Sequence, residues 1–241
     1  MPLFQWCYTN TLKKALTLLF ILVFPSAIYI YLVAGKEKSF IRLAYYGPKK
    51  PIHVTVKGKN KIDTAFYQVP PFTFYDQSGN RVNSSVFNDK IWVGYFVHLN
   101  DVQKSAPMAV LMNRIEERTD LDTALKLVTF ALDSESAKQL QDYSNSIHAG
   151  KKRMFLSGNP TEINQLALEG FYKPVDSSYV DGYKHFFLID KEGHIRGIYD
   201  GYKVKEIDKL IDEINILEAA YFVEKEIKDE KAGKGQEHDA I

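Results

Sequence analysis

The chain has 241 residues, which is enough for one domain of ordinary size with attached segments. Its 31 basic and 30 acidic residues give a formal charge of +1, which excludes the strong basic field of a nucleic-acid-binding protein. The single cysteine is Cys7, so a disulfide within the chain and a CxxC or CxxxC redox pair are both excluded.

An apolar run follows a short N-terminal segment, residues 1–14. Ala15–Ala34 contains twenty residues without a charge, the length of a helix that crosses the hydrocarbon core of a bilayer. A cleaved signal peptide and a buried core helix are the alternatives. The run is longer than the apolar region of a signal peptide, and it has no polar stripe of the kind a core helix shows. We therefore predict one N-terminal transmembrane helix at residues 15–34.

Charge alone leaves the orientation of this helix open. Two lysines precede it and several basic residues follow it, which favours a cytoplasmic C-terminal side. A long folded domain, however, is translocated largely regardless of the charge that flanks the span.

Composition divides the rest of the chain into three parts. Residues 35–65 are polar, contain Gly47-Pro48 and a lysine-rich stretch, and are expected to form a linker. Residues 66–220 carry the periodic apolar pattern of a folded domain. Residues 221–241 are charged and contain glycine, so we expect a disordered tail.

Apolar periodicity within residues 66–220 predicts strands that alternate with helices. Continuous apolar runs predict strands covered on both faces, and spacings of three and four residues predict helices. In chain order the prediction is a hairpin at 71–82, a strand at 90–98, a helix through 108–115, a strand at 127–132, helices at 134–147 and 159–170, strands at 185–190 and 195–201, and a helix at 204–217. This order favours an α/β, thioredoxin-like fold, with a mixed central sheet flanked by helices.

Five stretches of the sequence resemble the SCO/SenC family, the copper chaperones of cytochrome oxidase assembly. They are YYGPKK, VPPFTFYDQSGNRV, KIWVGYF, FLSGNPTEINQLALEGFYKPV and FFLIDKEGHIRGIYDG, in this order within Ala44–Leu217. The resemblance implies a thioredoxin fold that one N-terminal helix tethers to the cytoplasmic (inner) membrane. It also implies that the domain lies in the periplasm.

The resemblance further implies where the family's metal ligands fall in this chain. The family holds Cu(I) with two cysteines spaced CxxxC at the start of a helix, where thiolates are favoured. A gap-free alignment places Asp101 and Ser105 at these positions, and a shifted alignment places Leu99 and Gln103 there. Neither alignment offers sulfur, so the resemblance implies a degenerate member of the family.

The family's third ligand, a distant histidine, is displaced as well. Its position falls at about Gly182, and His185 lies three residues later. Together with His98 and Asp101, His185 could form a nitrogen and oxygen site that suits zinc or Cu(II) better than Cu(I). The alternative, which we favour, gives these residues structural or solvent-facing roles.

Other residues that carry reactive groups are expected to have ordinary roles. Ser105 has no base placed near it by the sequence, and a serine at a helix start is usually a cap. The basic stretch Lys151–Arg153 lies at a loop-to-strand junction and is expected to be solvated, with contact to lipid or to an acidic partner as the alternative. The remaining histidines have no partner at ligand spacing on one element: His53, His148, His194 and His238.

The sequence thus predicts a membrane-anchored pseudo-enzyme without a cofactor or a bound metal. Its predicted partner is an integral membrane protein or respiratory complex of the cytochrome oxidase type, which it helps to assemble or to stabilise, and not a nucleic acid. Two alternatives stay open: a chaperone for copper or another metal that uses substitute ligands, and a thiol-independent enzyme or sensor on the same scaffold.

Overall fold

The computed structural model describes the chain in seven stretches. These are residues 20–21, 23–25, 42–56, 58–119, 125–150, 152–172 and 183–238. The chain divides into two compact units, Met1–Ile41 and Arg42–Ile241. Within the predicted span 15–34, residues 20–21 and 23–25 are helical, and the others lie outside the described residues. Among the helices of the described stretches, none is both long and apolar enough to cross a membrane.

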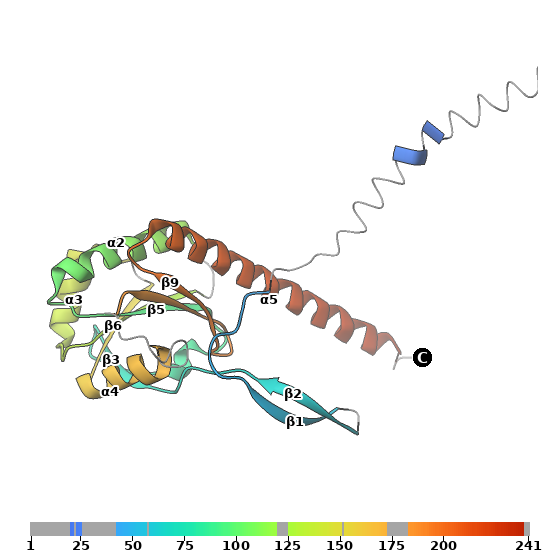
Figure 1. The fold of residues 1–241 in the computed structure, drawn as a ribbon, viewed down its shortest axis with the longest axis horizontal. Helices are drawn as coiled ribbons and strands as arrows, with labels where there is room; N and C mark the ends of the chain where they lie inside the picture. The colour runs from blue at the N-terminus through green and yellow to red at the C-terminus, as the bar shows by residue number, and fades with distance from the viewer. Residues whose placement is uncertain are drawn as a thin grey trace, which may run out of the picture. The chain divides into compact units, whose positions relative to one another are not determined.

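A seven-stranded mixed sheet forms the centre of the second unit (Figure 1). Its strands lie in the order β4-β3-β7-β6-β5-β8-β9. Their bounds are β3 (Thr73–Asp76), β4 (Arg81–Asn83), β5 (Trp92–Val97), β6 (Lys126–Ala131), β7 (Arg153–Ser157), β8 (His185–Ile189) and β9 (Ile195–Asp200). The helices are α2 (Val102–Arg118), α3 (Ala137–Ser146), α4 (Pro160–Gln165) and α5 (Val204–His238), with a 3-10 turn, η1 (Ser84–Phe87), and a π-helical segment, η2 (Leu166–Tyr172).

The middle of the sheet is parallel. Strands β5, β6 and β7 run in the same direction, and every residue of β5 is buried, as expected of a strand covered on both faces. Trp92 pairs with Lys126 and Val97 pairs with Ala131, so the carboxyl ends of β5 and β6 meet at one edge of the sheet. The strands predicted at 90–98 and 127–132 are therefore confirmed.

Helices cover both faces of the sheet, and two hydrophobic cores result (Figure 1). On one face, α2, α3 and α5 pack against the strands with side chains such as Met112, Leu140 and Leu210. On the other face, α4 and η2 enclose an aromatic cluster, in which the ring centroid of Phe130 lies 4.7 Å from that of Phe96 and 5.4 Å from that of Phe72. This is the predicted α/β, thioredoxin-like architecture.

The helix starts follow local capping chemistry. Ser136 accepts a hydrogen bond from the backbone N–H of Gln139, and the Gln139 side chain accepts one from the N–H of Ser136, which together form a capping box at α3. Asn159 accepts from the N–H of Thr161 at 2.9 Å, with Pro160 at the first position of α4. The start of α4 agrees with the sequence prediction, whereas α3 begins at Ala137, three residues after the predicted start at 134.

Residues 50–65 differ from the linker that the sequence predicted for 35–65. They form an antiparallel hairpin, β1 (Lys50–Val56) and β2 (Lys59–Ala65), which is separate from the seven-stranded sheet. Gly58 in the turn has a φ of 75°, a left-handed conformation that glycine adopts without strain. The prediction was wrong here because polar side chains on both faces of the hairpin resemble a linker in composition.

The segment before the hairpin is bonded to the folded domain. Arg196 on β9 donates hydrogen bonds to the carbonyl oxygens of Leu43 at 2.8 Å and of Ala44 at 3.1 Å. The N–H of Tyr46 donates to the carbonyl oxygen of Ile195 at 2.9 Å. The Arg196 guanidinium lies 3.9 Å from the ring centroid of Tyr45, close enough for a cation–π contact. The folded domain therefore begins near Arg42 and not at residue 66.

The C-terminal segment is helical where the sequence predicted a disordered tail from residue 221. Helix α5 continues to His238. Glu224 and Lys228 form an ion pair at 2.8 Å, four residues apart on the helix, and such pairs stabilise exposed helices. The high charge that suggested disorder therefore also permits a solvated helix.

Arg153 differs from the solvated residue that the basic stretch Lys151–Arg153 predicted. It is 2% exposed and is the first residue of β7, at the predicted loop-to-strand junction. Its Nη2 donates to Asn113 at 2.7 Å and to Glu116 at 3.2 Å. A buried guanidinium is costly unless it is paired, and Glu116 supplies the opposite charge.

Candidate functional site

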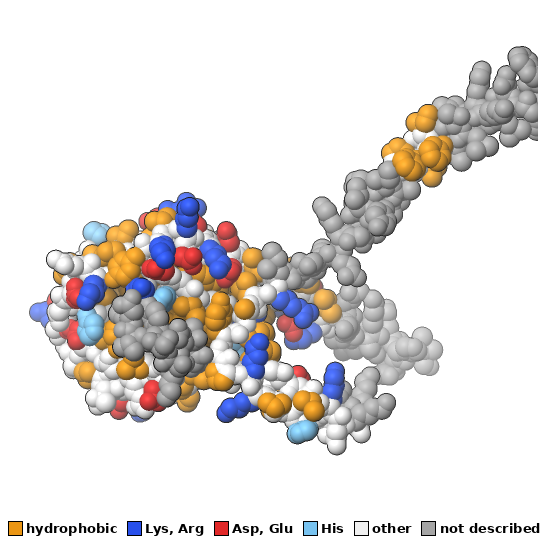
Figure 2. All heavy atoms as spheres, in the orientation of Figure 1, with side chains coloured by type: hydrophobic (Ala, Val, Ile, Leu, Met, Phe, Trp, Pro, Cys, Tyr) orange, Lys and Arg blue, Asp and Glu red, His pale blue; other side chains and the backbone are white. Residues whose placement is uncertain are grey.

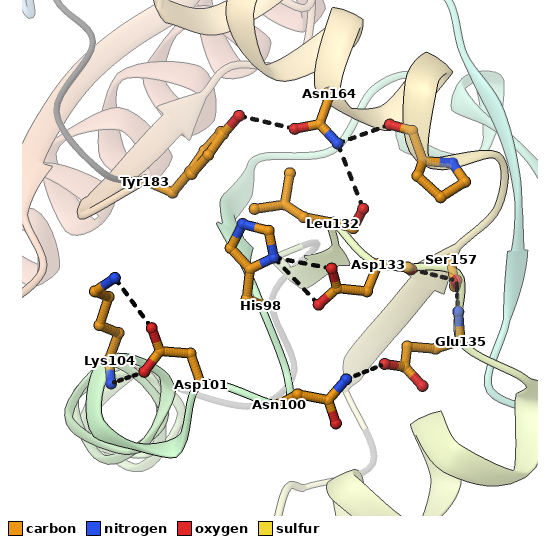
Figure 3. A network of polar contacts seen from close by, with 11 residues as sticks. His98, Asn100, Asp101, Lys104, Leu132, Asp133, Glu135, Ser157, Asn164 and Tyr183 are labelled. Atoms are coloured by element: carbon orange, nitrogen blue, oxygen red, sulfur yellow. Dashed lines mark hydrogen bonds and ion pairs between the residues drawn. The ribbon is translucent and has the colours of Figure 1, made fainter.

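The candidate site lies where the parallel strands β5 and β6 end. The chain leaves β5 through residues 98–101 and enters α2, and it leaves β6 through residues 132–136 and enters α3. Figure 3 shows that the side chains of both connections face one another, with Asn164 of α4 on a third side. The site is therefore built from three elements that are distant in the sequence.

Asp101 occupies the first of the two positions that correspond to the family's cysteines. It is the N-cap of α2, and its carboxylate accepts from the backbone N–H of Lys104 at 3.3 Å. Its other oxygen lies 3.0 Å from Lys104 Nζ. These hydrogen bonds and the adjacent ammonium hold the pKa of Asp101 below its ordinary value. The carboxylate is thus already engaged by the helix that it caps.

Ser105 occupies the second position and is 1% exposed. It lies one turn inside α2, so it is not the helix cap, which is Asp101. Its hydroxyl faces Tyr143 of α3, whose pKa is raised by burial, and the neighbouring hydroxyl of Ser105 opposes that rise. A buried serine without a neighbouring base has no means of acting as a nucleophile.

His98 and Asp133 form the clearest polar pair of the site. His98 Nδ1 lies 3.0 Å and 3.1 Å from the two carboxylate oxygens of Asp133. The side chains are 45% and 36% exposed. A carboxylate that accepts from Nδ1–H leaves Nε2 as the nitrogen with a lone pair, which is the arrangement of many metal-binding histidines. The sequence analysis proposed His98 but missed Asp133, although Asp133 directly follows the predicted strand at 127–132.

Two tyrosines separate His98 from His185. The ring of His98 contacts that of Tyr183 edge to face, with centroids 5.8 Å apart. Tyr183 contacts Tyr172 at 5.7 Å, and Tyr172 contacts His185 at 6.1 Å. His185 is the first residue of β8. The predicted combination of His98, Asp101 and His185 is therefore not brought together as one ligand set.

Tyr183 is held in an unusual backbone conformation. Its φ is 43°, in the left-handed region that residues other than glycine rarely adopt. Its hydroxyl donates to Asn164 Oδ1 at 2.8 Å, and Asn164 Nδ2 donates to the carbonyl oxygen of Pro160 at 2.8 Å. These bonds fix the tyrosine over the site. Gly182, where the family's histidine falls, lies outside the described residues.

A different group of side chains has metal-ligand types close together. Among the described residues, Asp190, Glu192 and His194 are the one set of three or more such side chains whose ligand atoms lie within 4.8 Å of one another. Asp190 already accepts from Arg196 Nη1 at 3.0 Å and from two backbone N–H groups. The guanidinium would repel a cation, so this cluster stabilises the β8–β9 turn and is a poor metal site.

A cavity of about 730 Å³ lies at another edge of the domain, between β3 and α4. Its lining includes Phe72, Tyr75 and Leu166 together with three charged residues, Arg81, Glu162 and Glu169. None of the lining residues is a histidine, a cysteine or a serine. The cavity therefore offers no substitute for the thiol chemistry that is missing at the start of α2.

Comparisons with known proteins assign the fold and the family. The sequence model of the SCO1/SenC family matches residues 61–217. A SCO1 protein homolog of Bacillus subtilis (strain 168) is 25% identical over 166 residues, which cover 65% of this chain and 86% of the relative.

Two solved structures have the same fold. A SCO1/SenC family lipoprotein from Bacillus anthracis superposes with a TM-score of 0.53 at 21% identity, over 63% of this chain and 95% of that one. BsSco, described as a member of the Sco family of cytochrome c oxidase assembly proteins with a disulfide switch, superposes with a TM-score of 0.52 at 23% identity, over 62% and 92%. The family model spans more than half of the chain, and the chain's one cysteine, Cys7, lies outside the matched residues. The chain therefore belongs to the SCO1/SenC family, as a degenerate member that lacks the CxxxC cysteines.

Proposed function

We propose that this chain is a non-catalytic, membrane-anchored accessory protein that helps to assemble or to stabilise a respiratory complex of the cytochrome oxidase type. A helix at residues 15–34 anchors it in the inner membrane, and the domain lies in the periplasm. The proposal draws the type of complex from the family, whose member BsSco is described as a cytochrome c oxidase assembly protein.

The start of α2 is the observation that carries the proposal. Asp101 caps the helix and pairs with Lys104, and Ser105 is buried beneath the same turn. Asp101 thus stabilises the start of α2 and Ser105 packs inside the domain, whereas two metal-binding cysteines would direct their sulfur atoms at the metal. Neither side chain is a soft ligand, so neither favours Cu(I). What remains for function is the surface of the domain and its attachment to the membrane.

A second function is favoured by one observation. His98 is oriented by Asp133 and is 45% exposed, so its Nε2 is available to a hard or borderline metal ion. In this alternative the protein delivers zinc or Cu(II) through substitute ligands. The oxygen and nitrogen donors of the site fit these ions better than Cu(I).

Genetic complementation separates the two functions. The gene is deleted, and membranes from cells that express each variant are analysed for assembled cytochrome oxidase by its haem absorbance. We expect oxidase content to fall on deletion and to recover with the wild type, with a double Asp101→Ala and Ser105→Ala variant, and with His98→Gln. Equal amounts of each variant in the membrane, shown by immunoblot, control for folding.

Three outcomes decide the matter. Recovery with all variants supports the accessory role, because it requires no ligand at the site. Failure of His98→Gln alone, while His148→Gln still restores the oxidase, supports the metal-delivery alternative. Unchanged oxidase content after deletion refutes the proposed complex, and co-purification with the full chain from native membranes then identifies the actual partner.

A further inference from the structure

The β1–β2 hairpin is separate from the central sheet and contributes little to the hydrophobic cores. It forms a sheet of two strands with seven cross-strand pairs, and it pairs with no other strand of the described residues. Its described side chains are all exposed except Val54 and Ala65, which are half-buried. A two-stranded hairpin in water is at best marginally stable. A hairpin in this state is expected to be stabilised by contact with something else.

The hairpin is also mostly outside the part of the chain that matches the family. The family model begins at residue 61, so β1, the turn and the first residues of β2 precede it. Most of the hairpin therefore lies outside the residues that the family model matches.

Charge is concentrated in this short segment. Residues 49–65 contain five lysines and one aspartate, a net charge of +4 in a chain whose total formal charge is +1. Figure 2 shows the hairpin at the lower right of the view, where blue and orange side chains predominate. The other residues of the chain therefore carry a net formal charge of −3, so positive charge is concentrated in the hairpin.

The register of the hairpin sorts these side chains onto two faces. Directly paired residues share a face, and Ile52 pairs with Asp63 while Val54 pairs with Lys61. One face thus combines Ile52 and Val54 with Lys50 and Lys61, and it carries one acidic residue, Asp63, opposite Ile52. The opposite face carries Ile62 beside His53 and Thr55, and Ile62 is 67% exposed. The first face, with apolar side chains flanked by lysines, has the pattern of elements that lie in a membrane interface.

We propose that the hairpin binds the surface of an anionic lipid bilayer through the face of Ile52, Val54, Lys50 and Lys61. The lysines contact phosphate groups, and the β-branched side chains enter the boundary between headgroups and acyl chains. Lysine stems reach along apolar surface while their ammonium groups stay in the polar layer. Each lysine near an anionic surface strengthens partitioning by roughly fivefold at low salt.

The composition of the hairpin favours a lipid surface over a protein. Residues 49–65 contain no tryptophan, tyrosine, phenylalanine or arginine, the residues that usually provide the energy of protein interfaces. Lysine, which is frequent here, is depleted in the cores of such interfaces. A protein that pairs with an edge of the hairpin is the other occupant that the test addresses.

The position of the hairpin along the chain agrees with this assignment. The inference rests on the proposed membrane attachment, because the hairpin begins sixteen residues after the predicted span ends at Ala34. Residues 43–46 are bonded to β9, so the hairpin extends from the folded domain. A hairpin this close in sequence to the proposed span is within reach of the membrane that would anchor the chain.

The test uses the full chain reconstituted into vesicles. Because Cys7 is the only cysteine, a Cys7→Ser background allows one fluorophore to be placed at a chosen site. An environment-sensitive dye is attached at Val54→Cys on the proposed face, at Thr55→Cys on the opposite face, or at Lys138→Cys on α3. Vesicles contain either phosphatidylglycerol mixed with phosphatidylethanolamine, or phosphatidylcholine alone.

We expect the dye at position 54 to shift to the blue in the anionic vesicles only, and the dyes at positions 55 and 138 to shift little. High salt should reverse the shift, because it screens the lysine–phosphate attraction. A double Lys50→Glu and Lys61→Glu variant should abolish it. A double Lys138→Glu and Lys205→Glu variant changes the total charge equally at exposed sites elsewhere and should leave it intact.

Vesicle flotation distinguishes this inference from the anchor. Flotation in both lipid mixtures with no shift at position 54 refutes the hairpin contact and leaves the anchor intact. Flotation only with anionic vesicles, together with the shift, supports the hairpin and refutes the anchor. No flotation in either mixture refutes both. A shift that appears only in native membranes and is lost after protease treatment of those membranes indicates a protein partner and overturns the lipid assignment.

Discussion

Two histidine–aspartate pairs lie at opposite ends of the same sheet, and they differ in burial and in hydrogen-bond partners. His194 Nδ1 lies 3.2 Å from Asp190 at the β8–β9 turn, with the side chains 15% and 0% exposed. His98 Nδ1 lies 3.0 Å from Asp133 at the end of β5, with the side chains 45% and 36% exposed. The residue types and the distances are nearly the same. Only the surroundings distinguish the two pairs.

The carboxylate of Asp190 has several other donors. Besides His194, it accepts from the N–H of Glu192 at 3.1 Å, from the N–H of His194 at 2.8 Å, and from Arg196 Nη1 at 3.0 Å. Asp133, in contrast, directs both oxygens at His98. A His–Asp pair is therefore structural when the carboxylate is buried among several donors, and it is available to solvent or a ligand when the carboxylate has one. The comparison can be tested by removing each carboxylate in turn.

Replacement of Asp190 by alanine should have the largest effect. It leaves the guanidinium of Arg196, whose side chain is 8% exposed, buried without its counter-charge. Removing one partner of a buried ion pair costs about 3–5 kcal/mol of unfolding free energy. Urea unfolding of a fragment spanning residues 42–238, followed by circular dichroism, measures this cost. A loss below about 1 kcal/mol would show that the turn does not depend on Asp190.

Replacement of Asp133 by alanine should have a small effect on stability. Its pair with His98 is more than one-third exposed, and exposed pairs contribute about 0–1 kcal/mol. The same unfolding experiment applies, with Asp190→Ala as the matched comparison. If the two substitutions cost the same, the difference in burial between the pairs does not decide their roles.

The smallest effect is expected from Asp101→Asn, and it should depend on pH. Lys104 and the N-terminal turn of α2 lower the pKa of Asp101 in the folded state. The stabilisation is therefore present above the ordinary aspartate pKa of about 3.9, and it is lost as the pH falls through the lower folded value. The wild type should lose more stability than Asp101→Asn between pH 5 and pH 3, as measured by urea unfolding across roughly this range. Identical pH profiles would show that the carboxylate is not engaged at the helix start.

The central sheet could be predicted because its strands are buried on both faces. The runs at 90–98 and 127–132 are almost continuously apolar, which is typical of a strand covered on both faces. The burial of Arg153 at the start of β7 was missed because its charge indicates exposure unless its buried partner Glu116 is known. The hairpin β1–β2 was missed because neither face is buried, so no apolar alternation dominates its sequence.

The candidate site could be predicted only in part. The positions Asp101 and Ser105 follow from the family resemblance, and the structure places both in the first turns of α2. The partner of His98 lies 35 residues further along the chain, just after the neighbouring parallel strand β6. Local periodicity does not specify which strands are neighbours, so Asp133 was not assigned. That Asp101 is the N-cap of α2 and that Ser105 is buried likewise depend on tertiary packing, which local sequence patterns do not reveal.

The hydrogen bonds from Arg196 to Leu43 and Ala44 shorten the tether that would join the domain to its anchor. Eight residues separate the predicted end of the span, Ala34, from Leu43, and the nine steps between consecutive Cα atoms, at about 3.4 Å each, reach at most about 30 Å. A free linker up to Phe66 would reach about 110 Å. For a flexible tether the effective concentration falls with about the −3/2 power of its length, so nine steps in place of thirty-two raise it roughly sevenfold. A partner in the same membrane would meet the domain at this higher effective concentration, so that a weak contact would be occupied more often.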